Sequence, residues 1–370
     1  MAGVCGAEYV SKEKRMLAAL ESGSHDLAVI GRGSNFTWLT SGGNWQVASS
    51  CEFGPAVLLI GPERRQLIAN TMDGHRILEE ELTGLDFELV DLPWYSSSPH
   101  AKALELSGKA KAVADMRFGS HLEDPDFFVR LHYPLSKLEI SRYRELAGQA
   151  EQILLDTAGW VKPGVTERAI AQYMMGRYAD SGMDAPVLII GSDERIAKYR
   201  HCLPSDKRVK NTLLLAPAPR KWGLCCPISR MVSFGSAPSA ELKRSFDALL
   251  AIEAATFSGC KPGSAFTGIL DTQKALFAKH GYPEEWQKHF QGGMTGYIIN
   301  DPTKCTNPAA RVVEGQAFNW YITITGAKVE ETVISRNGMA PEIISATGIW
   351  PLRSCTYDQD TFMLPEVLVR

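Results

Sequence analysis

The side chains best suited to chemistry in this 370-residue chain gather between positions 200 and 230. His201 and Cys202 are adjacent, and Cys225 and Cys226 follow a short distance along the chain. If these segments lie close together, an imidazole and thiols could bind a soft metal ion or form a thiol nucleophile. Neighbouring strand residues point to opposite faces, so at most one of Cys225 and Cys226 would face such a site. Packing in the core is the favoured interpretation of both cysteines.

A β-hairpin is expected to carry these two cysteines. Residues 212–215 form a short apolar run, and residues 220–223 have the composition of a turn. Residues 224–234 are then predicted to return as the antiparallel partner strand. The function depends on what this hairpin presents to its surroundings.

The composition of the chain describes a globular protein. Hydrophobic residues make up 45% and charged residues 22%, with a formal net charge of -3, so no basic excess indicates nucleic acid as a partner. No apolar run reaches the roughly 18 residues that a membrane span needs, and the N-terminus lacks the features of a signal peptide. We therefore expect a cytoplasmic protein with no membrane partner, whose cysteines are reduced thiols.

The first third of the chain alternates helical and strand patterns, which is typical of an α/β domain. Ser11 can cap a helix over residues 12–21, and Asn35 opens an aromatic-rich loop that extends to position 42. Further helices are predicted at residues 74–82 and 101–106. Strands are predicted at residues 26–30, 56–60, 66–69, 87–90 and 112–114.

A domain boundary is predicted at Tyr133-Pro134, which divides the chain into domains 1–133 and 134–370. A chain of 370 residues is too long for one ordinary core and suits two. Just after the boundary, Ser136 and Glu139 have the spacing of a capping box, in which hydroxyl and carboxylate each satisfy a free N–H at a helix start. A long helix should follow.

The second domain repeats its own order of elements. Lys-Pro-Gly occurs at residues 162–164 and again at 261–263, a spacing of 99 residues. Each tripeptide follows one predicted helix and precedes another, at residues 166–181 in the first half and 266–280 in the second. Two helices followed by strands, present twice, indicate an internal duplication.

With these features the chain resembles the creatinase, aminopeptidase P and Xaa-Pro dipeptidase family, whose members share the pita-bread fold. The resemblance is carried by the hairpin over residues 212–234, by the internal repeat, and by residues 35–42, which are similar to the family's Asn-x-x-Tyr/Trp-Leu-(Thr/Ser)-Gly signature. It implies a mixed fold of helices and strands, α/β (α+β). A creatinase-like N-terminal domain (1–133) would precede a pita-bread domain (134–370) with an internal pseudo-twofold repeat.

The family's metal ligands are two aspartates, one histidine and two glutamates, and most of these positions are lost here. Ala216 and Pro227 stand at the aspartate positions of the hairpin. Gly293 and Tyr321 stand at those of the histidine and the first glutamate, so that only Glu330 remains. One carboxylate cannot hold a hard divalent ion. The resemblance therefore implies neither a metal nor another cofactor.

The resemblance also implies which residues act in the emptied cleft. His201 matches the histidine with which creatinase, a metal-free family member, splits a C–N bond, and His289 matches a substrate-binding histidine. Glu330 would orient His201 or hold the substrate. A neutral imidazole can accept a proton and return it near neutral pH, so His201, His289 and Glu330 are expected to be catalytic. Taken singly, each histidine could instead be a hydrogen-bonded structural residue.

Substrate contacts are expected from the same strands. Arg230 and Lys328 add positive charge that would suit a carboxylate-bearing substrate. Alternatively, Arg230 pairs with Glu330 or Glu331 and only neutralises the vacated pocket. The expected substrate-binding set is completed by Ser229, Tyr321 and Glu331.

Two functional classes follow from this site. The first is a metal-independent hydrolase that cleaves a C–N bond of a small amide, amidine or dipeptide-like substrate. The second is a catalytically inactive pseudopeptidase that binds a peptide or metabolite or acts as an interaction protein. The retained histidines favour the enzyme, whereas a cleft filled by Met294, Trp320 and Tyr321 would favour the binding protein.

The resemblance finally implies a homodimer, because family members commonly pair so that one subunit closes the cleft of the other. The aromatic loop around Phe36, Trp38 and Trp45 could make that contribution, or it could simply pack within its own domain.

Overall fold

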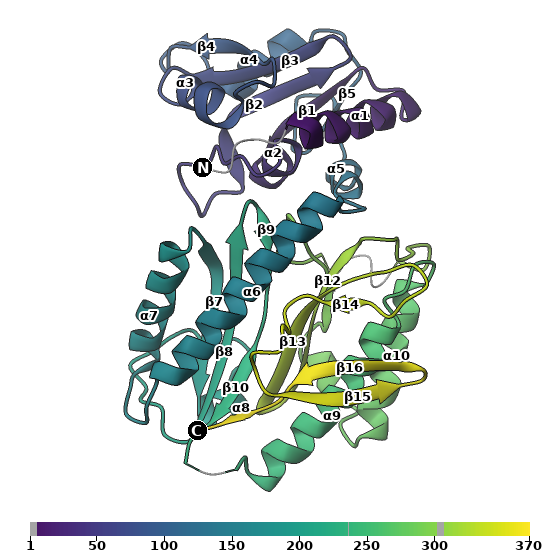
Figure 1. Cartoon of the computed structure of the whole chain (residues 1–370). Coiled ribbons are helices and arrows are strands. Elements are labelled where there is room, and N and C mark those ends of the chain that lie inside the picture. Colours follow the sequence, from purple (N-terminus) through teal and green to yellow (C-terminus); the bar gives the residue numbers. More distant parts are fainter. Residues whose placement is uncertain (1–5, 236, 302–306) are drawn as a thin grey trace. The chain divides into compact units, whose positions relative to one another are not determined.

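The first unit of the chain, which ends at Tyr133, is built on one six-stranded sheet (Figure 1). The computed structural model describes residues 6–235, 237–301 and 307–370. The strands of this sheet are β1 (Leu27–Arg32), β2 (Phe53–Gly61), β3 (Arg64–Asn70), β4 (Glu88–Leu92), β5 (Ala112–Ala114) and β6 (Leu122–Glu123). Their order is β4-β3-β2-β1-β5-β6, with antiparallel pairing of β1, β2 and β3 and parallel pairing elsewhere. The five strands predicted from the sequence are confirmed as β1 to β5.

Helices pack around this sheet, over a core that includes Val29, Leu59 and Ile68. They are α1 (Gly6–Ser22), α2 (Gly33–Leu39), α3 (Gly74–Arg76) with the π-helix η1 (Ile77–Glu81), α4 (Pro99–Ser107) and α5 (Pro125–Leu131). The cap predicted at Ser11 is wrong. Helix α1 is already formed at Gly6, because its first turns are anchored by the buried Tyr9 and by an ion pair between Glu8 and Lys12.

Helix α2 replaces the loop that was expected after Asn35. The turn from β1 into α2 is held by the buried carboxylate of Asp115. Asp115 accepts hydrogen bonds from the backbone N–H groups of Gly31 and Arg32 and from Nδ2 of Asn35, at 2.8–3.0 Å. Because Asp115 is 80 residues away from Asn35 in sequence, no local pattern could reveal this junction.

The aromatic side chains that were considered as a dimer contact pack inside their own unit. Phe36, Trp38 and Trp45 are at most 1% exposed, and Phe36 stacks on Trp45 with 4.1 Å between ring centroids. Their side chains therefore cannot close the cleft of a partner without unfolding this region, and packing is the correct interpretation.

The homodimer itself stays a prediction, but Phe36, Trp38 and Trp45 are no longer expected to form its interface. Light scattering at micromolar concentration should give a mass about twice the 40.7 kDa of one chain. A monomer mass across that range would contradict it.

The second unit, from Pro134 onward, begins with one half-domain. Its elements are α6 (Lys137–Trp160), α7 (Glu167–Asp180), β7 (Asp184–Ser192), α8 (Glu194–Lys198), β8 (Thr212–Lys221), β9 (Leu224–Cys225) and β10 (Arg230–Ser233). The predicted capping box of α6 is confirmed, because Ser136 Oγ accepts from Glu139 N–H and Glu139 Oε2 accepts from Ser136 N–H. Helix α6 packs against β8 (Figure 1).

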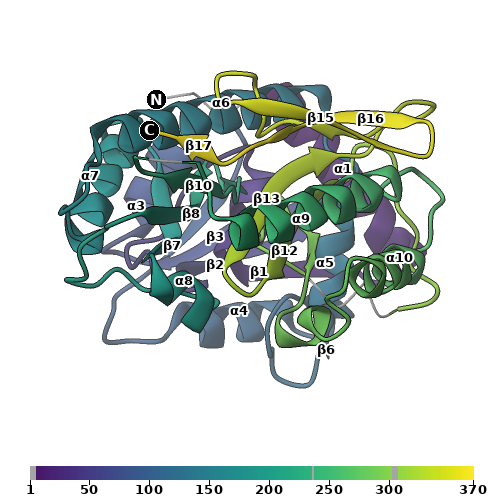
Figure 2. The same ribbon diagram turned by 90° about the horizontal axis from the view of Figure 1, so that it is seen from below.

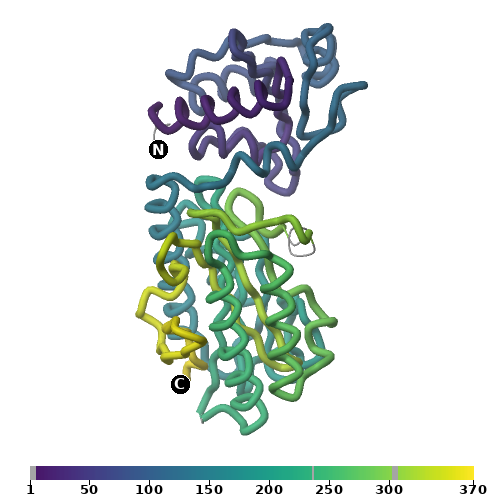
Figure 3. The backbone as a smooth tube through the Cα atoms, turned by 90° about the vertical axis from the view of Figure 1, so that its right-hand side faces the viewer, coloured from purple at the N-terminus to yellow at the C-terminus, as the bar shows by residue number. Residues whose placement is uncertain are grey.

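The second half-domain also begins with two long helices and continues into strands. Its elements are α9 (Ala240–Ser258), α10 (Phe266–Lys279), the 3-10 helix η2 (Glu285–Lys288), β11 (Gly292–Met294), β12 (Ala317–Ile324), β13 (Ala327–Ile334) and β14 (Glu342–Ile343). Helices α9 and α10, in green, run side by side in Figures 2 and 3, and α9 packs against β12 and β13. The chain closes with β15 (Leu352–Tyr357), β16 (Asp360–Pro365) and β17 (Leu368–Val369), the last of which pairs with β10. No described helix combines the length and apolar character needed to cross a membrane.

The internal duplication is confirmed by the two Lys-Pro-Gly turns, which make the same hydrogen bond. Gly164 N–H donates to the carbonyl of Val209, and Gly263 N–H donates to that of Val312, each at 2.8 Å. Both glycines have positive φ, 98° and 89°, which a residue with a Cβ adopts only with strain. The repeated tripeptide thus forms the same turn in each half. In each half it also binds a segment distant in sequence, at Val209 or at Val312.

The predicted hairpin is present, but its returning strand is interrupted. The register is constant, since Arg220 pairs with Cys225 near the turn and Leu215 pairs with Arg230 farther along. Between β9 and β10, the N–H groups of Cys226 and Ile228 donate to the carbonyls of Pro219 and Pro217 on β8, at 2.9 and 3.1 Å, but neither proline has an N–H to return. The N–H of Ser229 points to the other side of the strand and donates to the carbonyl of Glu330 at 3.1 Å. This isolated bridge links the sheets of the two half-domains.

Candidate active site

A pocket of about 390 Å³ lies between the strands of the two half-domains. Five of the eight site residues expected from the sequence line it, namely His201, His289, Tyr321, Lys328 and Glu330. Three of the positions that the resemblance assigns to metal ligands, Ala216, Pro227 and Tyr321, line the same pocket beside Glu330. The pocket therefore occupies the place that the resemblance assigns to the metal site.

An ion pair stands at the centre of the polar lining. Tyr321 on β12 is directly opposite Glu330 on β13, and Lys328 lies two residues away on the same face as Glu330. Lys328 Nζ is 2.7 Å from Glu330 Oε2 and 5.5 Å from the centre of the Tyr321 ring. Burial raises the pKa of Glu330, and the Lys328 ammonium opposes that shift. Lys328 thus supplies the positive charge that stabilises this buried carboxylate.

The two histidines form a hydrogen-bonded pair. Nε2 of His201 and Nε2 of His289 are 3.0 Å apart, and Nδ1 of His289 contacts the carbonyl of Phe290. A carbonyl can only accept, so Nδ1 of His289 carries a proton and donates it. In a neutral His289, Nε2 must then accept from the Nε2–H of His201. This assignment leaves Nδ1 of His201 as an unprotonated nitrogen, and no described residue pairs with it.

Both imidazoles are neutral at pH 7. Burial lowers the pKa of His289 to about 4, because its hydrogen bond to Phe290 only partly opposes the loss of solvation and the nearby Lys328 adds repulsion. Burial and Lys328 also lower the pKa of His201. His201 is nevertheless an exposed residue of the pocket lining, so its base form is both populated and accessible.

The expected contact between Glu330 and His201 is wrong. Among the described residues the Glu330 side chain pairs with Lys328, and the imidazoles pair with each other. Glu330 therefore acts on Lys328 and does not orient the general base.

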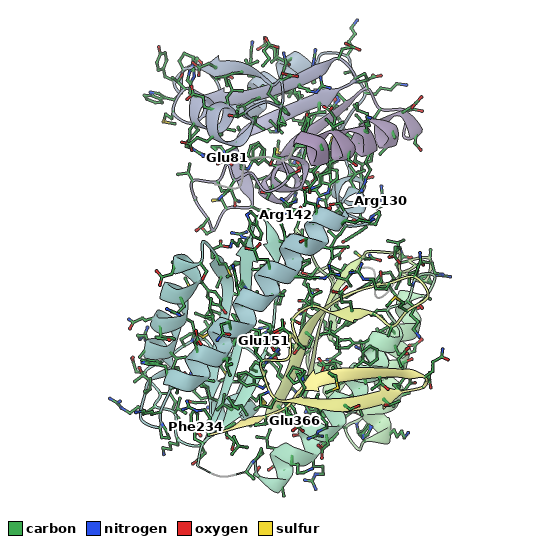
Figure 4. The ribbon with its side chains drawn as sticks, viewed as in Figure 1. Glu81, Arg130, Arg142, Glu151, Phe234 and Glu366 are labelled. Atoms are coloured by element: carbon green, nitrogen blue, oxygen red, sulfur yellow. The ribbon has the colours of Figure 1, made fainter. Side chains whose placement is uncertain are left out.

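Arg230, Ser229 and Glu331 do not line the pocket, so their expected substrate contacts are wrong. Arg230 is fully buried, with Nη2 2.7 Å from Glu151 Oε1 on α6, and it also pairs with Glu331 (Figure 4 labels Glu151). The alternative interpretation, in which Arg230 pairs with Glu331, is correct. Glu331 follows Glu330 on β13 and so points to the opposite face of the strand. Ser229 contacts the strand that carries Glu330 through its backbone, because its N–H donates to the Glu330 carbonyl.

The cysteines pack in the core, as the favoured interpretation predicted. Cys202, Cys225 and Cys226 are at most 1% exposed. Burial raises the pKa of each thiol, that of Cys225 to about 12, so none is a thiolate at neutral pH. These residues do not form a nucleophilic or soft-metal site.

Two asparagines of the pocket were missed by the sequence analysis. Asn319 on β12 is fully buried, its Nδ2 donates to the carbonyl of Pro227, and its Oδ1 has no partner among the described residues. Asn300 lines the pocket with both Nδ2 and Oδ1 buried and equally unpartnered. Asn319 could have been found, because it lies two residues before Tyr321 on the same strand face. Nothing in the local sequence distinguishes Asn300.

A second cluster of buried acids lies behind the pocket. Glu253 on α9 is fully buried, and neither of its carboxyl oxygens has a hydrogen-bond partner among the described residues. Burial, with added repulsion from Glu331 and Glu330, raises the pKa of Glu253 well above its ordinary value, although Arg230 opposes this. Burial therefore favours the protonated form of Glu253 in the folded protein.

This pKa shift predicts the pH dependence of the Glu253→Gln variant. A carboxyl whose pKa is raised by folding binds more protons in the folded state, so its contribution to stability falls as pH rises above about 4.5. The variant cannot ionise. Its free energy of unfolding relative to that of the parent should be higher at pH 8 than at pH 5, because only the parent loses stability as its buried carboxyl is driven to ionise. Urea denaturation at both pH values measures this, and a constant difference would contradict it.

The residues present do not fit the metal ions of the family. Within the described parts of the chain, no group of three or more His, Cys, Asp or Glu is placed to hold a metal ion. Of the pocket's donors, Glu330 is occupied by Lys328, whose ammonium would repel a cation. A dinuclear site needs several carboxylate or imidazole ligands held together.

We predict that the purified protein holds no stoichiometric transition metal, because Glu330 is the one carboxylate among the five ligand positions and it is paired with Lys328. Elemental analysis after expression in medium supplemented with manganese or cobalt tests this. A chelator should also leave the melting temperature unchanged. About two ions per chain would contradict the prediction.

Comparison with known proteins agrees with this architecture. The sequence model of metallopeptidase family M24 matches residues 141–337. An uncharacterized peptidase of Staphylococcus aureus strain MW2 is 24% identical over 213 residues, which are 55% of this chain and 60% of that protein. The chain thus spans about three fifths of the length of the curated relatives that it matches.

Solved structures share the fold over nearly the whole chain. A Xaa-Pro dipeptidase from Bacillus anthracis superposes with a TM-score of 0.76 at 16% identity, covering 98% of this chain and 100% of that one. The N-terminal domain of a FACT complex subunit from Cicer arietinum, chickpea, has a TM-score of 0.70 at 12% identity and covers 93% and 97%. The fold is therefore an N-terminal α/β domain followed by a pita-bread domain, as the resemblance implied. Since the family match extends over more than half of the residues, the chain belongs to metallopeptidase family M24.

Proposed function

We propose that the protein is a metal-independent hydrolase that cleaves a C–N bond of a small amide, amidine or dipeptide-like substrate in this pocket. The observation that carries the proposal is the free Nδ1 of His201, an accessible neutral nitrogen held by its hydrogen bond to His289. General bases work best when their unprotonated form is populated at the working pH.

The reaction can be written with the residues of this chain. Nδ1 of His201 accepts a proton from water as the water oxygen bonds to the carbon of the scissile C–N bond. As the substrate oxygen gains negative charge, it can accept a hydrogen bond from the unpartnered Nδ2 of Asn300. The C–N bond then breaks, and the proton on the His201 imidazolium passes to the leaving nitrogen. His289 holds the imidazole of His201 in the required tautomer throughout.

A substrate panel with a chelator present tests this proposal. Purified protein is incubated with N-acyl amino acids, dipeptides, small amides and amidines, and products are measured by mass spectrometry. At least one class should be cleaved at a rate that the chelator does not change. If no member of the panel is cleaved, or if added metal is required, the hydrolase proposal fails.

The second candidate is a binding protein without catalysis. It is favoured by the mostly apolar pocket wall, which includes Val187, Ile189 and Phe290, and by the bulk of Tyr321 at a former ligand position. The N-terminal domain of the FACT complex subunit from chickpea has a similar fold, so this architecture also occurs in a component of a protein complex. A melting temperature that rises with a ligand of the panel, without any product, would favour this candidate.

A further inference from the structure

The charges that line the pocket favour an anionic ligand over an ammonium. With both histidines neutral, Lys328 and Glu330 are the charged groups among the described lining residues. Glu330 is the lining carboxylate, and it is 5% exposed and already paired with Lys328. A ligand ammonium would have to displace Lys328 from Glu330 and would repel it.

Lys328 retains capacity to bind a ligand oxygen. An ammonium has three N–H donors, and the pair with Glu330 uses one of them. The described residues offer its Nζ no second acceptor. A ligand carboxylate can therefore approach Lys328 without breaking the ion pair, and it would receive a charge-assisted hydrogen bond.

The unpartnered asparagine atoms match an amide group. Asn300 presents one donor, Nδ2, and one acceptor, Oδ1, and Asn319 presents a further acceptor. A secondary amide carries one C=O acceptor and one N–H donor, which together pair with a carboxamide. Buried polar groups without partners are destabilising, so a ligand that pairs with them binds more tightly. The apolar wall around Val187 and Ile189 can then pack against an aliphatic side chain.

We propose that the pocket selects N-acylated amino acids with an aliphatic side chain over free dipeptides. The ligand carboxylate binds Lys328, and its amide binds Asn300. The claim that N-acylated amino acids are substrates rests on the proposed function. The claim that the pocket binds them in preference to free dipeptides does not depend on catalysis. Hydrolysis would add water across the amide bond, which breaks between carbonyl carbon and nitrogen, and would release a carboxylate and a free amino acid.

Three matched ligands test the preference by isothermal titration calorimetry. N-acetyl-L-leucine carries the carboxylate and the neutral acyl group, N-acetyl-L-leucinamide lacks the carboxylate, and glycyl-L-leucine carries an ammonium in addition. N-acetyl-L-leucine should bind at least about tenfold more tightly than either comparator, since each loses or opposes a charge-assisted contact. Equal or tighter binding of glycyl-L-leucine overturns the proposal, and so does the absence of N-acetyl-L-leucine binding at millimolar concentration.

Variants locate the contacts within the pocket. The double variant Lys328→Met/Glu330→Gln removes both charges together, so that no buried charge is left unpaired. It should abolish the preference for N-acetyl-L-leucine over N-acetyl-L-leucinamide, and Asn300→Leu should weaken binding of both by about tenfold. Lys243→Met, at an exposed position of α9 outside the pocket, is the matched control and should change nothing. A double variant that folds and keeps the preference overturns the assignment to Lys328.

Binding and turnover separate this inference from the proposed function. Tight binding of N-acetyl-L-leucine, with no member of the substrate panel cleaved, supports the ligand class and contradicts the hydrolase. Cleavage of free dipeptides without binding of N-acetyl-L-leucine contradicts the ligand class and supports the hydrolase.

Discussion

Turnover of the best substrate should fall by about two to four orders of magnitude in His201→Ala, because the variant loses the neutral base that takes the proton from water. The parent should keep its activity into mildly acidic conditions. Burial and Lys328 lower the pKa of His201 below 6.5, so the base form is lost only as pH falls through that lowered value. The acidic limb of the kcat/KM profile should therefore lie below pH 6.5.

The matched control for this variant is Cys225→Ala. Cys225 is buried in the hairpin with a raised pKa, and it does not line the pocket, so turnover should stay near that of the parent. Thermal melting of both variants separates loss of chemistry from loss of folding. Near-parent turnover in a folded His201→Ala would end the assignment of His201 as the base.

Arg230→Met should lower the free energy of unfolding by about 3–5 kcal/mol, the range for removing one partner of a buried ion pair. The variant leaves two buried carboxylates, Glu151 and Glu331, without their shared cation. It also removes the hydrogen bond from Arg230 to the carbonyl of Ser345, at 2.8 Å. Urea denaturation at pH 7 measures the loss.

Two further variants identify its cause. Glu151→Gln/Arg230→Met/Glu331→Gln removes all three charges and should recover a large part of the stability, because no ion remains buried without a partner. Arg168→Met disrupts the exposed pair with Asp206 and should leave the melting temperature almost unchanged. A loss below about 1 kcal/mol in Arg230→Met would show that the cluster is not needed for stability.

Local sequence signals predicted much of this fold because their physical cause is itself local. The capping box of Ser136 and Glu139 closes within one helical turn, and the positive φ of Gly164 and Gly263 is a property of the Lys-Pro-Gly turns themselves. The features that were missed depend on distant partners. Helix α2 needs Asp115, and the interruption of the hairpin strand accompanies the contact between Ser229 and Glu330.

The candidate site was predicted in part for the same reason. Alternation along β12 and β13 is enough to place Tyr321, Lys328 and Glu330 on one face, once the strands are paired. The neighbours of Arg230 could not be deduced in this way, since Glu151 is 79 residues away on a helix. Asn300 follows β11 without a repeating pattern, so only the folded chain brings it to the pocket.

The backbone hydrogen bond from Ser229 to Glu330 joins the two copies of the duplicated unit, and residues of both copies line the pocket. The first copy contributes His201 and most of the apolar wall, and the second contributes His289, Lys328 and Glu330. Neither copy alone holds a complete set of interacting groups. A substitution in one half-domain therefore alters one wall of the pocket, while the backbone bond between Ser229 and Glu330 continues to hold the two walls together.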